Sequence, residues 1–318
     1  NQLKNLINFY EIDGYFVPKN DEFFGEYVPE NKDKLKFISN FTGSYGFALI
    51  LKKKNYLFVD GRYTLQGNIQ SGKFFKIITI PMQLPSDVLK NKKISIGFDP
   101  KLHTEYMIQR LFKGCNVKLI PLNKNLINKI WKRNNTKQSN KFYKLRDKDS
   151  GERSEDKIKK ILKTFNINKI DLQLISSSEN IAWLLNLRGS DSEFSPLPNS
   201  YLILSNENKI YFFCDLKKIS KKLKKNLKNI NILDIKYIDK FLLKIKNKNI
   251  QLDSSSCSIF FKSILKKNNT IFEKQDPIYL LKSIKNKTEI NNIIKTHIYD
   301  GVALTKFLFW VKNNFKRK

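Results

Sequence analysis

The heptapeptide Ile38-Ser-Asn-Phe-Thr-Gly-Ser44 returns later in the chain as Leu184-Leu-Asn-Leu-Arg-Gly-Ser190. Asn, Gly and Ser occupy the third, sixth and seventh places of both copies. Similarity between two stretches of one chain is typical of a duplicated structural unit. We therefore expect the same fold to be present twice.

Both copies lead into a predicted β-hairpin. In each, two short runs rich in β-branched and aromatic residues flank a polar turn and stop at an aspartate, which is the usual hairpin pattern. The runs are 47–51 and 56–59, ending at Asp60, and 201–204 and 209–213, ending at Asp215. The two hairpins extend the duplication beyond the heptapeptide.

A helix is expected after each hairpin. In the second copy apolar residues recur every three or four positions, which places the lysines of 217–228 on an opposite, solvated face. These apolar residues are Leu216, Ile219, Leu223, Leu227 and Ile230. The spacing predicts a single amphipathic helix over this segment.

The remaining segments alternate between strands and helices. The expected strands are 74–80, 94–99 and 117–120 in the first copy and 230–235, 250–253 and 270–273 in the second. The expected helices are 86–90 and 103–112 in the first copy and 238–246 and 256–265 in the second. This alternation predicts the α/β class, with two tandem domains that each have a mixed sheet and helices on both faces.

Composition along the chain places the domain boundaries. The first domain is expected over 1–132 and the second over 151–282, joined by a polar linker at 133–150 that has few apolar residues. Trp131, just before the linker, is expected to anchor the edge of the first domain.

The last segment, 283–318, has no counterpart in either copy. Asn286 and Glu289 form a capping-box pattern, and apolar residues at helical spacing then continue to about Asn314. So broad an apolar stripe needs a partner surface. We expect it to be the first helix of a third domain, of which the chain contains only the start.

Composition narrows the class of protein. With 318 residues, 41% of them hydrophobic, the chain can form two cores, which excludes wholesale disorder. No apolar run approaches the roughly 20 residues that span a bilayer, which excludes a transmembrane protein. Three separated cysteines without a CxxC pair exclude a disulfide scaffold or zinc ribbon and favour a reducing, cytoplasmic compartment.

The net charge of +31 raises the question of nucleic-acid binding. Only seven of the 60 basic residues are arginines, the side chains that base readout and bidentate phosphate contacts favour. The lysines are also spread over the chain instead of forming one block. We therefore interpret the charge as solvated surface and expect neither nucleic acid nor a membrane as a partner.

Few residues offer chemistry. His297 and Asp300 lie one helical turn apart, which could bring two metal ligands together, but a packed, hydrogen-bonded histidine is the favoured interpretation. His103 is expected to cap or flank the helix that begins there. Arg188 is expected to pair with a buried carboxylate, for which Asp191 is the local candidate.

The turn after the first hairpin, Asp60-Gly-Arg-Tyr63, has a structural interpretation in which Asp60 caps a helix and Arg62 is held by a carboxylate. Gly43 and Ser44 do not form a phosphate loop, because neither GxGxxG nor GKS is present. With only two histidines, no Ser–His–Asp or Cys–His set is expected.

Several motifs resemble the long, three-domain form of Xaa-Pro aminopeptidase (aminopeptidase P). In the first half they are Asp13-Gly-Tyr-Phe-Val-Pro18, Gly25-Glu-Tyr-Val-Pro29, Phe41-Thr-Gly-Ser44 and Val59-Asp-Gly-Arg-Tyr-Thr-Leu-Gln66. Later they are Ile181-Ala-Trp-Leu-Leu-Asn-Leu-Arg-Gly-Ser-Asp191 with Pro196, and Leu281-Lys-Ser-Ile-Lys-Asn286 with Glu289, His297, Asp300 and Ala303. The resemblance covers nearly the whole chain in the family's order.

The resemblance implies two non-catalytic creatinase/prolidase N-terminal-type domains followed by a pita-bread catalytic domain. In the family that third domain holds two metal ions, usually manganese, through two Asp, one His and two Glu. A metal-bridging hydroxide releases the N-terminal residue of peptides with proline at the second position. None of those five ligands is expected in this sequence, so the chain alone should bind no metal, contain no catalytic residue and cleave nothing, while the whole enzyme is expected to be a homodimer.

The resemblance also gives Arg62 a second interpretation, at the rim of the substrate cleft, because in related creatinase-type enzymes the N-terminal domain of one subunit approaches the active site of another. Phe23 and Phe194 stand where the family often has histidine, so a role for those histidines at domain interfaces does not carry over. The alternatives are a stand-alone, non-catalytic module for dimerisation or peptide interaction and, less favoured, a basic nucleic-acid binder.

Overall fold

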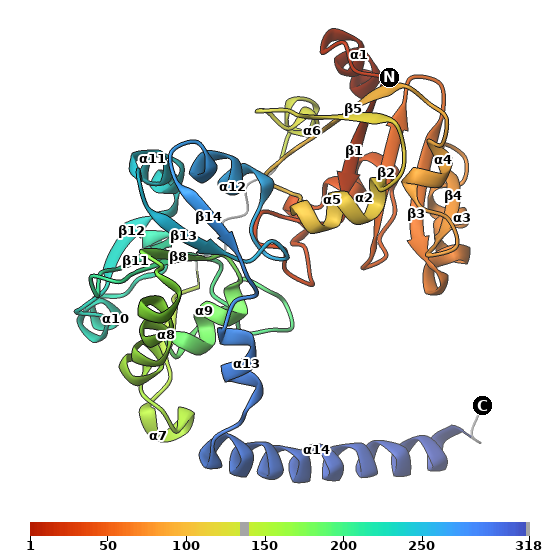
Figure 1. The fold of residues 1–318 in the computed structure, drawn as a ribbon. Coiled ribbons are helices and arrows are strands. Elements are labelled where there is room, and N and C mark those ends of the chain that lie inside the picture. The colour runs from red at the N-terminus through yellow and green to blue at the C-terminus, as the bar shows by residue number, and fades with distance from the viewer. Residues whose placement is uncertain (134–139, 316–318) are drawn as a thin grey trace.

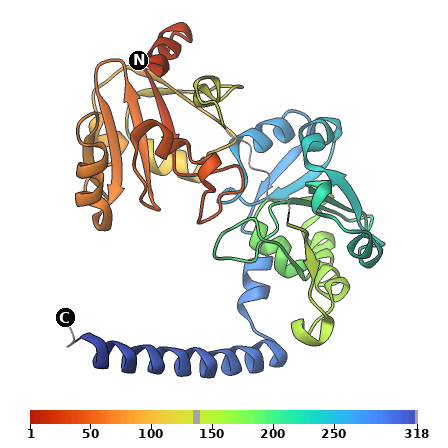
Figure 2. The same cartoon turned by 180° about the vertical axis from the view of Figure 1, so that it is seen from behind.

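The computed structural model describes residues 1–133 and 140–315. They form two α/β lobes that lie side by side, followed by a long helix that leaves the second lobe (Figures 1 and 2). Each lobe has a six-stranded sheet. The lobes therefore correspond to the two copies found in the sequence.

The first sheet has the strand order β4-β3-β2-β1-β5-β6. Strand β2 runs antiparallel to both neighbours and the other adjacent pairs are parallel, which makes a mixed sheet. The strands are β1 (Gly14–Pro18), β2 (Gly46–Leu51), β3 (Asn55–Asp60), β4 (Lys76–Ile80), β5 (Ile94–Phe98) and β6 (Val117–Pro121). The helices are α1 (Gln2–Phe9), α2 (Lys34–Ser39), α3 (Thr64–Ser71), α4 (Pro85–Val88), α5 (Glu105–Phe112) and α6 (Leu126–Ile130).

The second sheet repeats this topology with the order β12-β11-β10-β8-β13-β14. Here β10 is the strand that runs antiparallel to both neighbours. The strands are β8 (Leu172–Ile175), β10 (Tyr201–Ser205), β11 (Ile210–Cys214), β12 (Asn231–Asp234), β13 (Asn249–Leu252) and β14 (Thr270–Glu273). The helices are α8 (Ser154–Asn168), α9 (Ser178–Leu184), α10 (Lys221–Asn226), α11 (Ile238–Lys244) and α12 (Ile259–Lys266). The predicted duplication is confirmed.

Helices cover both faces of each sheet, as the alternation of segments predicts. In the first lobe one buried core lies beneath α1, α2 and α6, and the other beneath α4 and α5. In the second lobe the corresponding cores lie beneath α8, α9 and α10 and beneath α11 and α12. Apolar side chains on both faces of the strands explain their nearly continuous hydrophobic runs.

The repeated heptapeptide has a backbone reason. Asn40 and Asn186 follow helices α2 and α9 with φ of 63° and 53°, the left-handed conformation that Asn tolerates better than most residues. A Cβ on Gly43 would come within 2.3 Å of the Phe41 ring, and one on Gly189 within 2.9 Å of the Phe142 ring. Both places therefore need the residues that the repeat retains.

The single helix predicted between Leu216 and Ile230 is wrong. A 3-10 turn at Leu216–Lys218 is followed by the separate helix α10. The break occurs because the Ser220 side chain accepts a hydrogen bond from the backbone of Leu223 and so begins a new helix. The apolar spacing still reports burial, since Leu223 and Leu227 lie in the core.

Part of the segment expected as a linker packs on the second lobe. The Phe142 ring is buried in its core, and β7 (Tyr143–Lys144) pairs with β9 (Leu187–Arg188). Helix α7 (Asp147–Ser150) follows. Residues 134–139 of that segment lie outside the described residues.

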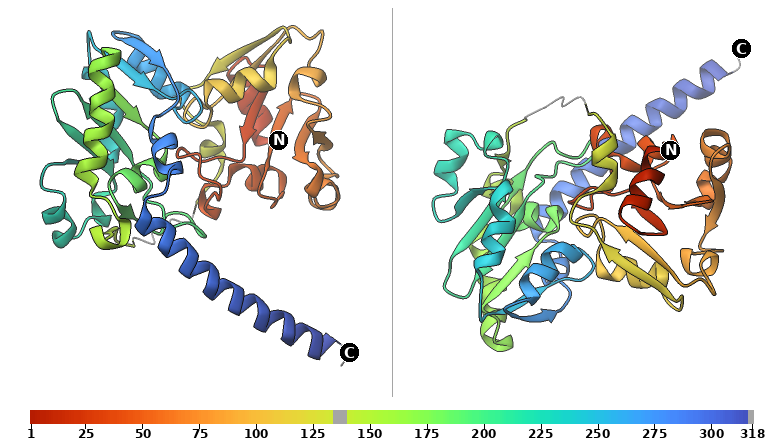
Figure 3. Two further views of the ribbon diagram at one scale, coloured as in Figure 1. Left: turned by 60° about the horizontal axis from the view of Figure 1, so that its bottom comes forward. Right: turned by 90° about the horizontal axis from the view of Figure 1, so that it is seen from above.

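After α13 (Ile278–Ser283), helix α14 (Lys287–Asn314) runs away from the second lobe (Figure 3). Its capping box is formed as predicted, since Asn286 and Glu289 exchange side chain–backbone hydrogen bonds at 2.9 Å. The large apolar side chains along it are exposed, from Ile290 to Phe315. No helix in the described part of the chain is long and apolar enough to cross a membrane.

Candidate interlobe site

The two lobes contact each other through equivalent loops, those that follow β5 and β13. Thr104 and Ser258 form an antiparallel β-bridge. The backbone N–H of Ile259 donates to His103 O at 2.9 Å, and that of Phe260 donates to Pro100 O at 3.0 Å. Backbone hydrogen bonds thus fix the start of α12 against the start of α5.

Ion pairs flank this backbone contact. Lys101 Nζ lies 2.9 Å from Asp239 Oδ2, and Lys262 pairs with Glu105. Both members of the Lys101–Asp239 pair are partly exposed, so solvent screens it and its contribution is on the order of 0–1 kcal/mol. These pairs orient the lobes more than they stabilise them.

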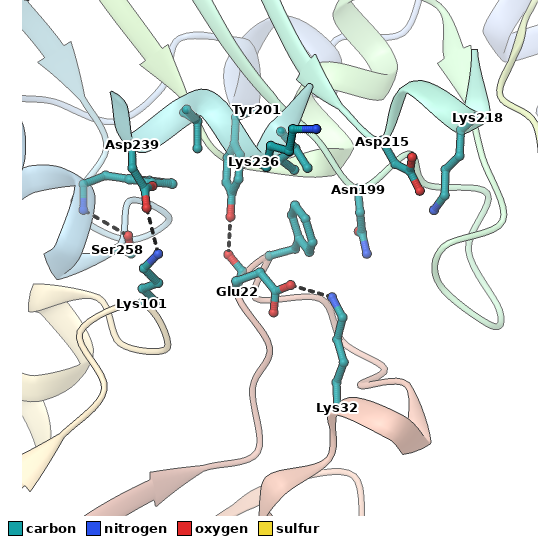
Figure 4. A pocket seen from close by; sticks show the side chains of 14 residues that line it. Glu22, Lys32, Lys101, Asn199, Tyr201, Asp215, Lys218, Lys236, Asp239 and Ser258 are labelled. Atoms are coloured by element: carbon teal, nitrogen blue, oxygen red, sulfur yellow. Dashed lines mark hydrogen bonds and ion pairs between the residues drawn. The ribbon is translucent and has the colours of Figure 1, made fainter. Parts of the chain in front are cut away.

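A cavity of about 420 Å³ lies beside this contact and is lined by both lobes (Figure 4). The Phe23 ring from the first lobe stacks on the Tyr201 ring of the second, with centroids 5.2 Å apart and planes at 24°. The Tyr201 hydroxyl donates to the backbone O of Glu22 at 2.8 Å. Burial, with the nearby Glu22 and Asp21 carboxylates, raises the pKa of Tyr201 well above its usual value, so it remains a phenol that donates.

The loop that carries Phe23 is held by charges within the first lobe. Lys32 Nζ lies 2.7 Å from Glu22 Oε1 and 3.2 Å from Asp21 Oδ2. Burial raises the pKa of Asp21, and the nearby Lys32 ammonium reverses only part of this rise. For Glu22 burial acts in the same direction, but Lys32 outweighs it and lowers the pKa. One ammonium between two carboxylates therefore fixes the loop at the mouth of the cavity.

Two further hollows, of about 560 and 630 Å³, continue from this cavity between the lobes. The Phe194 ring of the second lobe lies edge-on to Tyr27 of the first, with centroids 4.9 Å apart. Phe23 and Phe194, the two positions singled out in the sequence, are thus both at lobe–lobe contacts. Trp131 stacks on Phe37 at 4.9 Å beside one of these hollows, at the edge of the first lobe as expected.

The side chains of this site are suited to holding the two lobes together and to orienting them. All four of its lysines pair with carboxylates: Lys32, Lys101, Lys218 and Lys236. The neighbouring Cys257 is fully buried, which raises the pKa of its thiol to about 12, so it is not a thiolate nucleophile near neutral pH. The site joins the lobes and offers polar and aromatic contacts.

Arg62 lies on the first lobe, at the end of β3. Its guanidinium contacts the carboxylate of Asp60, with Nη2 2.6 Å from Oδ2, and Asp60 also accepts the backbone N–H of Arg62 at 2.9 Å. The side chain of Arg62 is 72% exposed. Asp60 therefore caps the turn and holds the arginine, as the structural interpretation predicts.

Two expectations about other residues are wrong. Arg188 does not pair with Asp191: its Nη1 donates to the carbonyls of Ala182 and Leu187 at 3.0 and 2.8 Å, because β9 turns the side chain back towards the end of α9. Asp191 pairs with Lys218 instead. His297 is not packed, since it lies on the exposed part of α14.

His103 does not cap α5. Thr104 caps that helix, and its side chain accepts from the N–H of Met107. The His103 ring is fully buried between Phe16 and Phe98, with centroid distances of 5.1 and 5.4 Å. Its Nδ1 lies 2.9 Å from Asp99 O, and burial lowers its pKa to about 4.

The described residues do not fit a two-metal centre. Within 1–133 and 140–315, no three His, Cys, Asp or Glu side chains come together in a way that could hold a metal ion. His297 and Asp300 therefore remain an isolated pair in this part of the chain.

Sequence reasoning missed the contact residues between the lobes, above all Tyr201, Lys101 and Asp239. The duplication did carry a signal for this contact, because it placed Thr104 and Ser258 at equivalent helix starts. Which equivalent surfaces meet depends on three-dimensional docking, which no local pattern encodes.

Comparisons with known proteins agree on the lobes. Residues 1–130 and 133–289 each match a family model described as the creatinase/prolidase N-terminal domain. The chain is 31% identical over 339 residues to Xaa-Pro aminopeptidase 1 of Dictyostelium discoideum, which covers 100% of this chain and 53% of that protein. It is 30% identical over 323 residues to Xaa-Pro aminopeptidase ApepP of Drosophila melanogaster, covering 96% and 52%.

A solved structure has the same fold. The X-prolyl aminopeptidase of Caenorhabditis elegans, described as a cytosolic enzyme with a di-nuclear active site, matches with a TM-score of 0.88 at 23% identity. The match covers 98% of this chain and 55% of that one. The chain thus spans about half the length of the relatives that it matches.

Proposed function

We propose, from the premise that this chain belongs to the creatinase/prolidase N-terminal domain family and is homologous to Xaa-Pro aminopeptidases along its whole length, that its two lobes are the non-catalytic part of such an enzyme. The protein to which they contribute releases the N-terminal residue of peptides with proline at the second position. The two lobes alone are inactive in this proposal.

The proposed chemistry is hydrolysis assisted by two divalent metal ions, with manganese as the proposed metal. The metal ligands are proposed to lie in a region that the relatives have and this chain does not match. The proposed protein is a cytoplasmic homodimer. The exposed Arg62 guanidinium is proposed to lie at the rim of the substrate cleft, where a cation held by Asp60 can contact a peptide carboxylate or carbonyl.

The observation that carries the proposal is the tandem arrangement of two lobes with one topology, matched along the whole chain by Xaa-Pro aminopeptidases. Helix α14 supports it, because its apolar side chains from Ile290 to Trp310 are more than 40% exposed and need a covering surface. A catalytic domain that continues from α14 would supply that surface.

The product of the complete gene that encodes these residues tests the proposal. The purified product is incubated with manganese and with two peptides that differ only in having Pro or Ala at the second position. We expect release of the N-terminal residue from the Pro peptide alone, loss of activity with a chelator, and recovery when manganese is restored. Absence of cleavage with manganese, cobalt and zinc, in a product shown to be folded, would reject it.

The alternative, a stand-alone module for dimerisation or peptide interaction, gives a different result in the same assay. It requires a gene product that is folded and never cleaves the Pro peptide with any divalent metal. The third possibility, a nucleic-acid binder, needs a separate test. Such a protein would be retained on DNA, and its affinity would fall steeply as the salt concentration rises.

A further inference from the structure

Each lobe has a cavity at the same place in its fold. The cavity of the first lobe has a volume of about 290 Å³ and lies where the ends of β3 and β4 meet α5. The cavity of the second lobe is the one described above, at the ends of β11 and β12 beside α12. Ligands of open α/β sheets commonly bind at the carboxyl ends of strands.

The strand register and the helix caps make the two linings equivalent. Asp60 and Asp215 both cap the turn after the hairpin. The paired residues Phe47–Phe58 in the first lobe then correspond to Tyr201–Phe213 in the second. Five lining pairs match in this way, namely Phe47 and Tyr201, Asp60 and Asp215, Ile80 and Ile235, Pro81 and Lys236, and Met107 and Phe261.

In the second lobe a segment from elsewhere reaches this cavity. The loop 21–24 of the first lobe brings the Phe23 ring onto Tyr201, while the Tyr201 hydroxyl donates to the backbone of Glu22. A turn with the sequence Asp-Glu-Phe-Phe, in which the backbone N–H of Phe24 donates to Asp21 O at 3.3 Å, therefore occupies the mouth of the cavity and places an aromatic ring beside the Glu22 carboxylate (Figure 4).

The first lobe receives no such segment, because the duplication is asymmetric at one connection. Between β1 and α2, residues 19–33 form the long loop that supplies Phe23. At the equivalent place β8 ends at Ile175 and α9 begins at Ser178, so residues 176 and 177 make the whole connection. The described second lobe therefore has no loop there to return to the first.

The cavity of the first lobe accordingly receives no ring from the other lobe, and although Phe47 is only 1% exposed, two other aromatic side chains of its lining are exposed. Its lining comes from the first lobe alone and includes Tyr45 and Tyr106, which are 47% and 59% exposed. It also includes the exposed Arg110, at the position where the second lobe has the buried apolar Ile264. This cation distinguishes the first cavity from the second and complements a carboxylate.

We propose that the cavity of the first lobe is a docking site for a turn of another protein that carries an aromatic side chain next to a carboxylate. The aromatic ring of the partner lies against Met107 and between the exposed side chains of Tyr45 and Tyr106, at the place that Phe23 takes beside Tyr201 in the second lobe. The carboxylate of the segment pairs with Arg110. The Phe47 side chain cannot donate a hydrogen bond as the Tyr201 hydroxyl does. The ion pair with Arg110 therefore takes the place of that hydrogen bond.

The chain carries its own reporter for this site. It has two methionines, Met82 and Met107, and both are in the first lobe. Met107 lines the cavity and Met82 is 84% exposed beside it. In protein labelled with 13C at the methionine methyl groups, the probe is a peptide with the sequence of residues 20–25, and the control peptide has Ala in place of the first Phe. The loop at the mouth of the second cavity is held there intramolecularly, which disfavours exchange with added peptide.

We expect the Phe peptide to shift the Met107 methyl signal saturably, through the ring current of the bound aromatic side chain, and the Ala peptide to leave it unchanged. Arg110→Ala should weaken binding about tenfold, as for loss of a charged hydrogen bond. Arg146→Ala removes an arginine of the second lobe and should change the affinity less than twofold. For each variant the shift is measured relative to its own Met107 signal without peptide.

Three results would overturn the proposal: no Met107 shift at millimolar Phe peptide, an equal shift with the Ala peptide, or equal effects of Arg110→Ala and Arg146→Ala. A Met107 signal that moves with protein concentration in the absence of peptide would assign the cavity to a second copy of this chain and would also overturn it. None of these results depends on peptidase activity, so the proposed function is tested separately.

Discussion

Thr104 and Ser258 begin equivalent helices in the two lobes, and they pair with each other in an antiparallel β-bridge. A contact between the same position of two copies is the arrangement found in two-fold symmetric dimers. The two lobes of this chain therefore meet much as two subunits would. The connecting residues 140–150 pack on the second lobe. The symmetry is broken by the long loop after β1, which brings Phe23 to the cavity of the second lobe and has no counterpart at the equivalent cavity of the first lobe.

Replacing Phe23 by Ala is expected to loosen the lobes, because its ring is stacked on Tyr201. The loss should be about 1–3 kcal/mol in the free energy of unfolding, as for one partly buried aromatic side chain. Phe194→Ala is the matched control, since the Phe194 ring is 70% exposed and its removal should cost under about 1 kcal/mol. Urea unfolding measures stability and small-angle scattering measures the separation of the lobes. Equal effects of the two variants would contradict this account of the contact.

Asn186→Ala is expected to destabilise the second lobe by about 2–4 kcal/mol, because it leaves the buried Lys157 ammonium with Trp183 O as its acceptor in place of two acceptors, and because it strains a left-handed residue. The Asn186 Oδ1 accepts from Lys157 Nζ at 2.8 Å, and burial already lowers the Lys157 pKa to about 8. Asn40→Ala is the control, because Asn40 is exposed and should lose only about 1 kcal/mol from its backbone conformation. Denaturant unfolding followed by fluorescence measures both, and equal losses would contradict the role of the Lys157 contact.

His103 predicts a dependence of stability on pH. Its pKa is about 4 when folded and near 6.5 when unfolded, so the unfolded chain binds more protons across this window. The free energy of unfolding should therefore fall as the pH drops below about 6.5, by about 2 kcal/mol between pH 7 and pH 5. In His103→Gln this part of the loss should disappear. Denaturant unfolding at the two pH values measures the difference, and identical losses in the two proteins would contradict the assignment.

Asn286→Ala is expected to fray the start of α14, because Asn286 caps the helix and its Nδ2 also donates to Ser150 O at 2.9 Å. Loss of the cap should cost about 1–2 kcal/mol in local stability. Hydrogen exchange of the first turn of α14 should accelerate, while that of α9 should not. Asn314→Ala, at the other end of the helix, is the control. Unchanged exchange in the first turn would show that the cap does not hold the helix.

The sequence predicted the elements that depend on local pattern. The alternating runs of the hairpins, the capping pair Asn286 and Glu289 and the duplicated heptapeptide are all written within a few residues of one another. The break at Ser220 was missed because the apolar spacing continues across it. His103 was missed because a polar residue at a helix start normally faces solvent, and here the neighbouring lobe and two phenyl rings cover it. The interlobe site was out of reach, since it depends on how two finished lobes dock.

The most direct test of the central claim compares residues 1–318 with the complete gene product in one assay. Mass spectrometry follows release of the N-terminal residue from a peptide with proline at its second position, with manganese present throughout. We predict a folded 1–318 polypeptide that releases nothing and a complete product that does. Release by residues 1–318 alone, or by neither polypeptide, would contradict the claim that these lobes serve a peptidase whose catalytic residues lie elsewhere.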